Sequence, residues 1–407
     1  MNLFEIKEFY GEETLKYKKL CTKLFRFSNP DLLNEEEYSK KLIDDDNNRD
    51  KDFVRLGAFY NGILYAGIEM IPYDVNINGK VCKMYGIGGV ISDTECPQKG
   101  AVKELFKKGF EIMREKGVYI SHLYPFEVNY YRQYGYDMSC EHSKWYVPIK
   151  AITSFKDGEL RHFDNSDKMK KDIIDIYNTF SKNKNMSIVR TEKQWNDFFE
   201  SHKSYTTNYF SYVHYTDGIA DGYMCYVTKE NADRPMDLET ERFWFTSFEG
   251  LRGLISYFPT QKSYADNAII KLPADIDISA LIDSCGGWGK KNASKVSFTD
   301  GTSKVVDVEK ILLNSEYYNS GKVTIKINDT YCPWNNDCFT LEFGNNTIVT
   351  RGGIPDIEMD IKSFTSSILG RYDFDSCKIF PDIKVYGNEE NLKKVFFPKS
   401  CFIEEHF

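Results

Sequence analysis

The run from residue 80 to residue 123 constrains the fold more than any other part of this chain. Residues 80–92 read as a strand that ends in the glycine-dense sequence Gly86-Ile-Gly-Gly-Val-Ile-Ser92. Residues 99–117 change period, with apolar side chains at helical spacing at Val102, Leu105, Phe106, Phe110 and Met113. Residues 118–123 return to a strand. A strand, a helix and a strand in this order predict two parallel strands joined by a crossover helix.

Turn signals divide the flanking sequence into further strands. Asn61-Gly62 and Asn78-Gly79 each stand between two apolar runs, which is a strong hairpin signal. Residues 1–50 read as polar and helical, with the acidic cluster Asp44-Asp45-Asp46 as a solvated loop that could also border a channel for a cationic substrate. Residues 54–148 therefore predict an α+β fold with a mixed sheet, antiparallel except for the parallel pair.

Beyond residue 151 the elements follow a similar order, with two helices ahead of a set of strands. Residues 236–242 are predicted to form an acidic connector, and residues 243–258 a helix. The last third begins near residue 296 and is expected to contain a helix over residues 357–370. The chain therefore has the length and pattern of two or three domains.

Composition excludes several classes of protein. The 407 residues carry a net charge of −8, which argues against an electrostatic nucleic-acid binder. No apolar stretch is long enough to cross a membrane, and the acidic N-terminal residues do not resemble a signal peptide. The ten cysteines include no Cys-x-x-Cys pair. We therefore predict a cytoplasmic protein with reduced thiols and no metal site.

The loop from Asp93 to Gly100 is a candidate phosphate site. It follows the glycine-rich strand and opens the helix of residues 99–117, whose N-terminus presents free N–H groups and the positive end of the helix dipole. Gly100 would let the backbone approach a ligand closely. The alternative is that these glycines only shape a bulge and a turn.

A tyrosine-rich stretch, residues 130–136, follows the second strand of the parallel pair. The loops after two adjacent parallel strands lie at the same sheet edge, so this stretch and the Asp93–Gly100 loop should flank one crevice. A tyrosine there has a proton to give to a leaving group. The alternative is a core aromatic, which is common in a chain with 28 tyrosines.

These motifs together resemble a known family. The strand containing Val90, then Gly100, the helix, the second strand and Tyr131-x-x-Tyr134-Gly135-Tyr136 look like the acetyl-CoA unit of the GNAT N-acetyltransferases. The whole chain resembles the enhanced-intracellular-survival (Eis-like) acetyltransferases. The additional matching features are the sequence Val305-Val-Asp-Val-Glu-Lys310 and a terminal Phe407 after Ile403-Glu-Glu.

The resemblance implies tandem GNAT domains followed by an SCP2-like, sterol-carrier α+β domain. Residues 1–150 would bind acetyl-CoA, residues 151–295 would be a degenerate second GNAT domain, and residues 296–407 would supply the C-terminal carboxylate. It also implies acetyl transfer from acetyl-CoA directly to a primary amine such as an aminoglycoside, a polyamine or a lysine side chain, without an acyl-enzyme. The family assembles as homo-oligomers, so a hexamer is expected.

The same resemblance assigns roles to individual residues. Tyr131 would be the general acid, and the α-carboxylate of Phe407 the general base. The cofactor-binding residues would be Val90, Ile91 and Ser92 on the strand, Gln98, Lys99, Gly100, Ala101, Val102 and Lys103 in the loop and helix start, and Phe126 and Glu127 beside the second strand.

The phosphate loop departs from the family pattern. The family usually has the pattern Arg/Gln-x-x-Gly-x-Gly/Ala in this loop. The corresponding positions here read Pro97-x-x-Gly100-x-Val102, so the first and last residues of the pattern differ. Lys99 and Lys103 could supply the missing positive charge. The departure keeps two alternatives open: a catalytically degenerate protein that binds a hydrophobic small ligand, and a structural subunit of an assembly.

Overall fold

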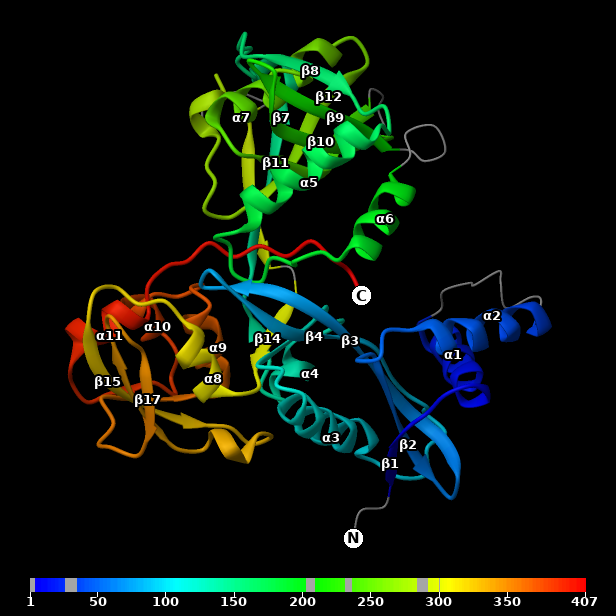
Figure 1. Ribbon diagram of the computed structural model, residues 1–407, viewed down its shortest axis with the longest axis vertical. Helices are drawn as coiled ribbons and strands as arrows, with labels where there is room; N and C mark the ends of the chain where they lie inside the picture. The colour runs from blue at the N-terminus through cyan, green and yellow to red at the C-terminus, as the bar shows by residue number, and fades with distance from the viewer. Residues whose placement is uncertain (1–3, 26–34, 203–208, 231–235, 284–291, 300) are drawn as a thin grey trace. The chain divides into compact units, whose positions relative to one another are not determined.

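The computed structural model describes residues 4–25, 35–202, 209–230, 236–283, 292–299 and 301–407 (Figure 1). The chain forms two compact units. Unit 1 comprises Met1–Ser139, Gly301–Pro398 and Glu405–Phe407, and unit 2 comprises Cys140–Asp300 and Lys399–Glu404. Each unit is therefore discontinuous in sequence.

Unit 1 contains a seven-stranded mixed sheet of order β1-β2-β3-β4-β5-β14-β6. Its strands are β1 (Glu5–Glu8), β2 (Val54–Tyr60), β3 (Ile63–Ile77), β4 (Lys80–Ser92), β5 (Ile120–Leu123), β14 (Thr302–Val305) and β6 (Asp137–Met138). β4 and β5 pair in parallel and the other pairs are antiparallel. The predicted parallel pair and the two Asn-Gly hairpins are confirmed. The sequence prediction missed β1, because this polar edge strand has no apolar alternation.

Helices cover both faces of this sheet. They are α1 (Glu12–Phe25), α2 (Glu35–Asn48), α3 (Ala101–Glu115) and α4 (Val128–Arg132). The apolar face of α3 packs on one side of the sheet, in a cluster that includes Leu56, Met70 and Ile87. α1 lies against the other side, where Tyr17 packs with Ile91. The crossover helix α3 therefore covers only one face of β4, and the other face packs against α1.

The acidic cluster in α2 is not a loop. Asp44–Asp46 lies within the helix, and the side chain of Asp46 accepts hydrogen bonds from Gly11 N (3.0 Å) and Thr14 Oγ1 (3.0 Å) and pairs with Arg55. Burial alone would raise the pKa of Asp46, but the Gly11 N–H and the Arg55 guanidinium hold it below its usual value. An acid held in this way stabilises the α1–α2 pair rather than facing solvent.

The C-terminal part of unit 1 forms a five-stranded sheet of order β17-β16-β15-β18-β19 with small helices. Its elements are α8 (Val308–Asn314), β15 (Gly321–Asn328), β16 (Cys338–Phe343), β17 (Ile348–Arg351), β18 (Ile357–Asp360), α9 (Ile361–Ile368), α10 (Phe374–Cys377), β19 (Lys384–Val385) and α11 (Glu389–Val395). The predicted helix over residues 357–370 is wrong in its first turn. Residues 357–360 pair with β15, and the Asp360 side chain caps α9 by accepting from Ser363 N at 2.9 Å.

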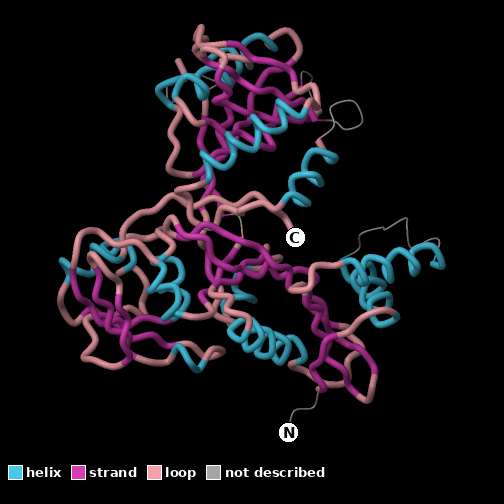
Figure 2. Tube along the Cα trace, in the orientation of Figure 1, coloured by secondary structure: helices cyan, strands magenta, loops and turns pink. Residues whose placement is uncertain are grey.

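Unit 2 contains a second seven-stranded sheet, of order β13-β7-β12-β11-β10-β9-β8. Its elements are β7 (Glu141–Pro148), β8 (Glu159–His162), α5 (Asp167–Ser181), α6 (Glu192–Ser201), β9 (Tyr209–Thr216), β10 (Ile219–Lys229), β11 (Met236–Phe245), α7 (Phe248–Ile255), β12 (Ala265–Pro273) and β13 (Ser294–Thr299). β11 and β12 pair in parallel, with α7 between them. Figure 2 shows the strands of each unit with their flanking helices.

The prediction of an acidic connector over residues 236–242 and a helix from residue 243 is wrong, because β11 occupies residues 236–245. Residues 236–245 form a central strand, because the charge of buried Glu239 is met across the sheet by Lys144 (2.8 Å) and Lys229. Acidic residues in a sequence indicate a surface only when no partner reaches them. The helix that follows, α7, begins at Phe248 rather than at residue 243.

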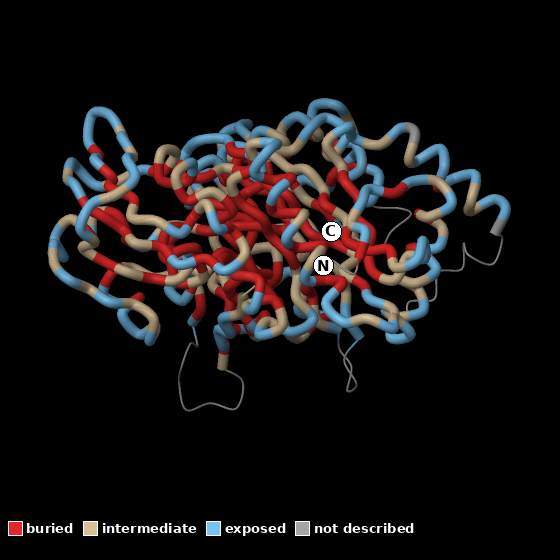
Figure 3. Tube along the Cα trace, turned by 90° about the horizontal axis from the view of Figure 1, so that it is seen from below, coloured by how far each residue is buried: buried red, intermediate tan, exposed pale blue. Residues whose placement is uncertain are grey.

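Two strands join a different sheet from the one suggested by sequence proximity. β7 lies within the predicted range 1–150 and pairs with β12 and β13 of unit 2. β14 lies within the range 296–407 and pairs with β5 and β6 of unit 1. In Figure 3 the buried residues, drawn red, lie mainly in the interior, and the exposed residues, drawn pale blue, lie mainly on the outside. No helix in the described ranges is long and apolar enough to span a membrane.

Candidate functional site

β4 and β5 separate at one end of their parallel pairing. The register runs from Met84↔Ile120 to Ile87↔Leu123, where β5 ends. β4 continues through Gly88–Ser92, and no described strand pairs with this stretch on the β5 side. Exposed backbone N–H and C=O groups on such an edge must find partners, and an extended ligand chain can supply them. Val90, Ile91 and Ser92, which sequence analysis named as cofactor contacts, lie on this edge.

A β-bulge turns the end of β4. The register with β3 passes from Glu69↔Gly88 to Gly67↔Ile91, so Gly89 and Val90 together face a single residue of β3. Gly89 has φ +56°, a left-handed conformation that favours glycine. Without the bulge, Ile87 and Ile91 would share a face, but they pack in separate clusters on opposite faces. The glycines that sequence analysis noted therefore do form a bulge, at the start of the free edge.

The C-terminal residue docks on β4. A Cβ atom added to Gly86 would lie 2.6 Å from the Phe407 ring, and one added to Gly88 would lie 3.3 Å from the Phe407 carboxyl carbon. The ring also contacts Tyr73 and Tyr124, each with a centroid distance of 5.3 Å. The α-carboxyl group of Phe407 therefore lies over the strand where β4 and β5 begin to separate.

Aromatic and acidic groups surround this terminus. The hydroxyl of Tyr124 donates to the backbone carbonyl of Glu405, and the His122 ring lies 6.0 Å from the Phe407 ring. Burial, followed by the nearby charge of Glu405, raises the pKa of Tyr73 to about 12. Sequence analysis missed Tyr73 and Tyr124. The long hairpin of β3 and β4 was the available signal for Tyr73, which lies opposite Met84.

The helix start after the loop is open. Gly100, at φ +96°, is the N-cap of α3 and makes no side-chain capping bond, so the first N–H groups of this 15-residue helix have no side-chain cap. Ala101 and Val102 are buried on the α3 core face and contribute only backbone there. Lys99 and Lys103 are exposed and Gln98 is half-buried. This arrangement suits an anion such as a pyrophosphate.

Tyr131 lies on α4, the short helix that follows β5. Its ring is buried, 3% exposed, between Phe106 (6.2 Å) and Phe126 (5.6 Å). Glu127 caps the helix by accepting from Asn129 N at 3.0 Å. Burial, with a smaller effect from Tyr130, raises the pKa of Tyr131 above its usual value, so the phenol stays protonated at neutral pH. Phe126 is 72% exposed, beside the strand end.

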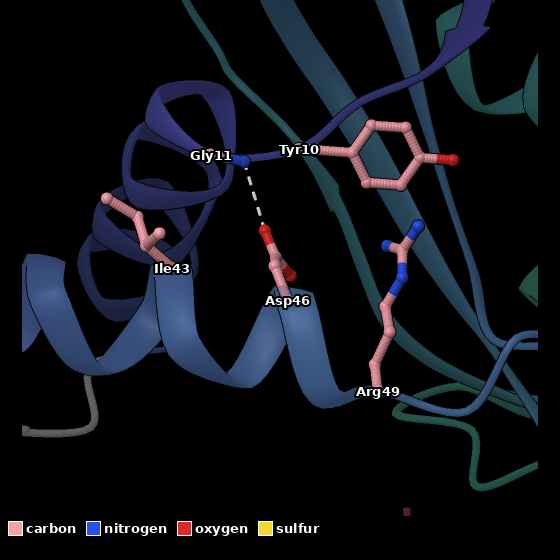
Figure 4. Close-up of a pocket in the computed structure, with 5 residues that line it drawn as sticks. All are labelled: Tyr10, Gly11, Ile43, Asp46 and Arg49. Carbon is pink, nitrogen blue, oxygen red and sulfur yellow. Dashed lines mark hydrogen bonds between the residues drawn. The ribbon is translucent and has the colours of Figure 1, made fainter.

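A separate pocket of about 360 Å³ lies between the start of α1 and α2 (Figure 4). The Asp46 carboxylate in it is already engaged by Gly11 N and Arg55. The Arg49 guanidinium lies 4.0 Å from the centre of the Tyr10 ring. Because the acid is committed to holding α1, this pocket lacks a free catalytic carboxylate. The described residues also contain no group of three or more metal-ligating side chains.

Two protein families match separate parts of the chain. Residues 5–139 match the acetyltransferase (GNAT) domain family, and residues 308–402 match the sterol carrier protein domain family. No curated protein sequence matches the chain at a significant level.

Solved structures with the same fold cover 99% of this chain and all of their own. They include a probable N-acyltransferase from Enterococcus faecalis (19% identity, TM-score 0.81), a GCN5-related N-acetyltransferase from Anabaena variabilis (18%, 0.81) and Eis1 from Mycobacterium abscessus (15%, 0.79). The chain thus contains a GNAT acetyltransferase domain and a sterol carrier protein domain in one polypeptide, and its fold is similar to that of Eis1.

Proposed function

We propose that this protein is an N-acetyltransferase that moves an acetyl group from acetyl-CoA directly to a primary amine. The observation that carries the proposal is the separation of β4 from β5 next to the docked Phe407 terminus. An extended thioester arm fits the free edge of β4. The Phe407 carboxylate lies at the end of this edge where β4 and β5 begin to separate. The matches to acetyltransferase relatives support acyl transfer in general.

Acetyl-CoA would be held by backbone at both ends. Val90, Ile91 and Ser92 offer main-chain groups to the pantetheine arm. The open N-terminus of α3 at Gly100, with Lys99 and Lys103 beside it, offers N–H groups and positive charge to the pyrophosphate. The residues present therefore fit the cofactor even though Pro97 and Val102 replace the usual loop residues.

The proposed chemistry balances its protons. The acceptor arrives as an ammonium ion, and the Phe407 carboxylate accepts one proton from it. The neutral amine then attacks the thioester carbon, and β4 backbone N–H groups stabilise the oxyanion. As the carbon–sulfur bond breaks, Tyr131 donates its phenolic proton to the departing thiolate and regains one from the amide nitrogen through solvent. The products are the amide, the coenzyme A thiol and one released proton.

The charge of this region and the family resemblance support the proposed acceptor class. Glu405 and the Phe407 carboxylate place negative charge beside the aromatic rings of Tyr73 and Tyr124, which suits a cationic amine such as an aminoglycoside, a polyamine or a lysine side chain. Residues 1–150 would hold the cofactor, residues 151–295 would be the degenerate GNAT domain, and residues 296–407 would deliver the terminus.

Two measurements test the proposal. Untagged protein titrated with acetyl-CoA in a calorimeter should bind in the micromolar range. A variant with one glycine added after Phe407 should bind equally well but lose at least tenfold in turnover with an amine panel, because its carboxylate is displaced. The control carries the same glycine at the N-terminus.

The opposite results would favour the alternatives. No binding at millimolar acetyl-CoA, with uptake of a fluorescent fatty acid instead, would support a degenerate GNAT protein that binds a hydrophobic ligand. Full turnover of the C-terminally extended variant would remove Phe407 as the base.

A further inference from the structure

Tyr17 reaches from α1 into the bulge of β4. Its hydroxyl donates to the backbone carbonyl of Gly89 at 2.6 Å, and its side chain is fully buried. α1 thus makes a direct hydrogen bond to the bulge of β4, at the start of the free edge.

Two glycines make room for this tyrosine. A Cβ atom on Gly67 of β3 would lie 2.7 Å from the Tyr17 ring, and one on Gly89 would lie 1.9 Å from its hydroxyl oxygen. The Phe9 ring makes a T-shaped contact with the same tyrosine, with the two ring centroids 5.4 Å apart. The socket therefore accepts the Tyr17 side chain only while both glycines are kept.

The hydrogen bond fixes the direction of a peptide group. The Gly89 carbonyl points toward α1, and in a trans peptide the next N–H, that of Val90, points the opposite way. The bulge and the left-handed Gly89 allow this orientation, and the Tyr17 hydroxyl holds it. The orientation of this peptide group therefore fixes where the backbone of Val90–Ser92, the next residues of β4, begins.

We infer that Tyr17 is a positioning residue for acetyl transfer. By holding the Gly89 carbonyl, it fixes the backbone orientation of Val90–Ser92, which in turn positions the thioester of the bound acetyl-CoA. The inference rests on the proposed function. It assigns Tyr17 no proton transfer, because its fully buried hydroxyl already donates its proton to the Gly89 carbonyl. A small misplacement of a reacting group costs turnover rather than binding.

The test replaces Tyr17 by phenylalanine. We expect kcat to fall about tenfold, while the Kd for acetyl-CoA stays within threefold and the pH profile keeps its shape. Tyr85→Phe is the matched control, because this buried β4 tyrosine also donates to a backbone carbonyl, that of Asp52, at 2.5 Å. Tyr85→Phe should leave kcat within twofold, and melting temperatures show whether both variants fold.

A double-variant cycle gives a second readout. Gly89→Ala alone should lose turnover strongly, because its Cβ meets the Tyr17 hydroxyl. The same change should cost less in a Tyr17→Phe background, where that atom is gone.

Each possible failure has a different meaning. Equal kcat in Tyr17→Phe and Tyr85→Phe, or additive effects of Tyr17→Phe and Gly89→Ala, overturns the positioning role while the transferase remains. Wild-type protein without turnover overturns the proposed function, and the role of Tyr17 with it.

Discussion

The two units contain the same local arrangement, a parallel strand pair with a helix between, and differ at the start of that helix. In unit 1 the loop Asp93–Gly100 separates β4 from α3, and Gly100 makes no side-chain cap. In unit 2 only Thr246 and Ser247 separate β11 from α7, and Ser247 Oγ accepts from Gly250 N at 2.8 Å. The first N–H groups of α3 therefore have no side-chain cap, whereas the start of α7 is capped by the Ser247 side chain.

Unit 2 also places an anion of its own at this helix start. The Asp221 carboxylate accepts from the Ser247 hydroxyl at 2.5 Å, and a Cβ atom on Gly250 would lie 2.3 Å from the Asp221 carbonyl oxygen. A carboxylate beside a helix N-terminus uses the same dipole that would attract a phosphate. The same chain order of strand, helix and strand therefore ends in an uncapped helix start in unit 1 and a capped one in unit 2, and our proposal places the phosphates at the uncapped start only.

The segments after the second strand differ as well. β5 is followed by α4, which carries Tyr131. β12 is followed by residues 274–283, which contain no tyrosine. At the corresponding described positions, unit 2 has neither the uncapped helix start nor the tyrosine that the proposed function uses in unit 1.

The largest expected effect is at the proton donor. Tyr131→Phe should lower kcat by about 10²-fold with little change in the Kd for acetyl-CoA, because it removes a general acid and no binding group. Steady-state kinetics and calorimetry measure the two quantities. Tyr130→Phe, in the neighbouring ring 5.1 Å away, is the control and should stay within threefold. Unchanged turnover in Tyr131→Phe would mean that another group protonates the thiolate.

A smaller effect is expected at the open helix start. Lys103→Glu places negative charge in the first turn of α3 and should raise the Kd for acetyl-CoA about tenfold, more at low ionic strength. Lys107→Glu, exposed one turn further along the same helix, should change the Kd by less than twofold. Equal effects of the two changes would contradict a phosphate site at Gly100.

The smallest effect is expected at the closed helix start of unit 2. Ser247→Ala removes the α7 cap and should cost about 1 kcal/mol of unfolding free energy in urea denaturation. The Kd for acetyl-CoA should not change, since this capped helix start is not part of the proposed cofactor site. Weaker acetyl-CoA binding by Ser247→Ala would show that unit 2 takes part in the cofactor site after all.

Much of the fold could be predicted from local pattern, and the misses have physical causes. The Asn-Gly hairpins and the crossover helix depend on signals among neighbouring residues, and the structure confirms them. β11 was mistaken for a connector because Glu239 is compensated by Lys144, which is distant in sequence. The first turn of the expected helix at residue 357 is a strand because β15 pairs with it.

The candidate site divides in the same way. Gly100 and the α3 start could be located from spacing alone, and Tyr131 and Phe407 were named through family resemblance. Tyr17, Tyr73 and Tyr124 could not be selected from among 28 tyrosines. Their importance depends on contacts with Gly89, Phe407 and Glu405, which lie far from them along the chain.

By itself the sequence determined the two Asn-Gly hairpins, the strand–helix–strand order of residues 80–123 and the start of α3 near Gly100, because periodicity and turn residues act over a few neighbouring residues. Tertiary structure alone decided that β14 completes the sheet beside β5, that β4 bulges at Gly89, and that Phe407 lies on Gly86 and Gly88. Those outcomes depend on which distant segments can pair and fill space together. A strand edge, a missing Cβ and a chain terminus become one site only when packing brings them into contact.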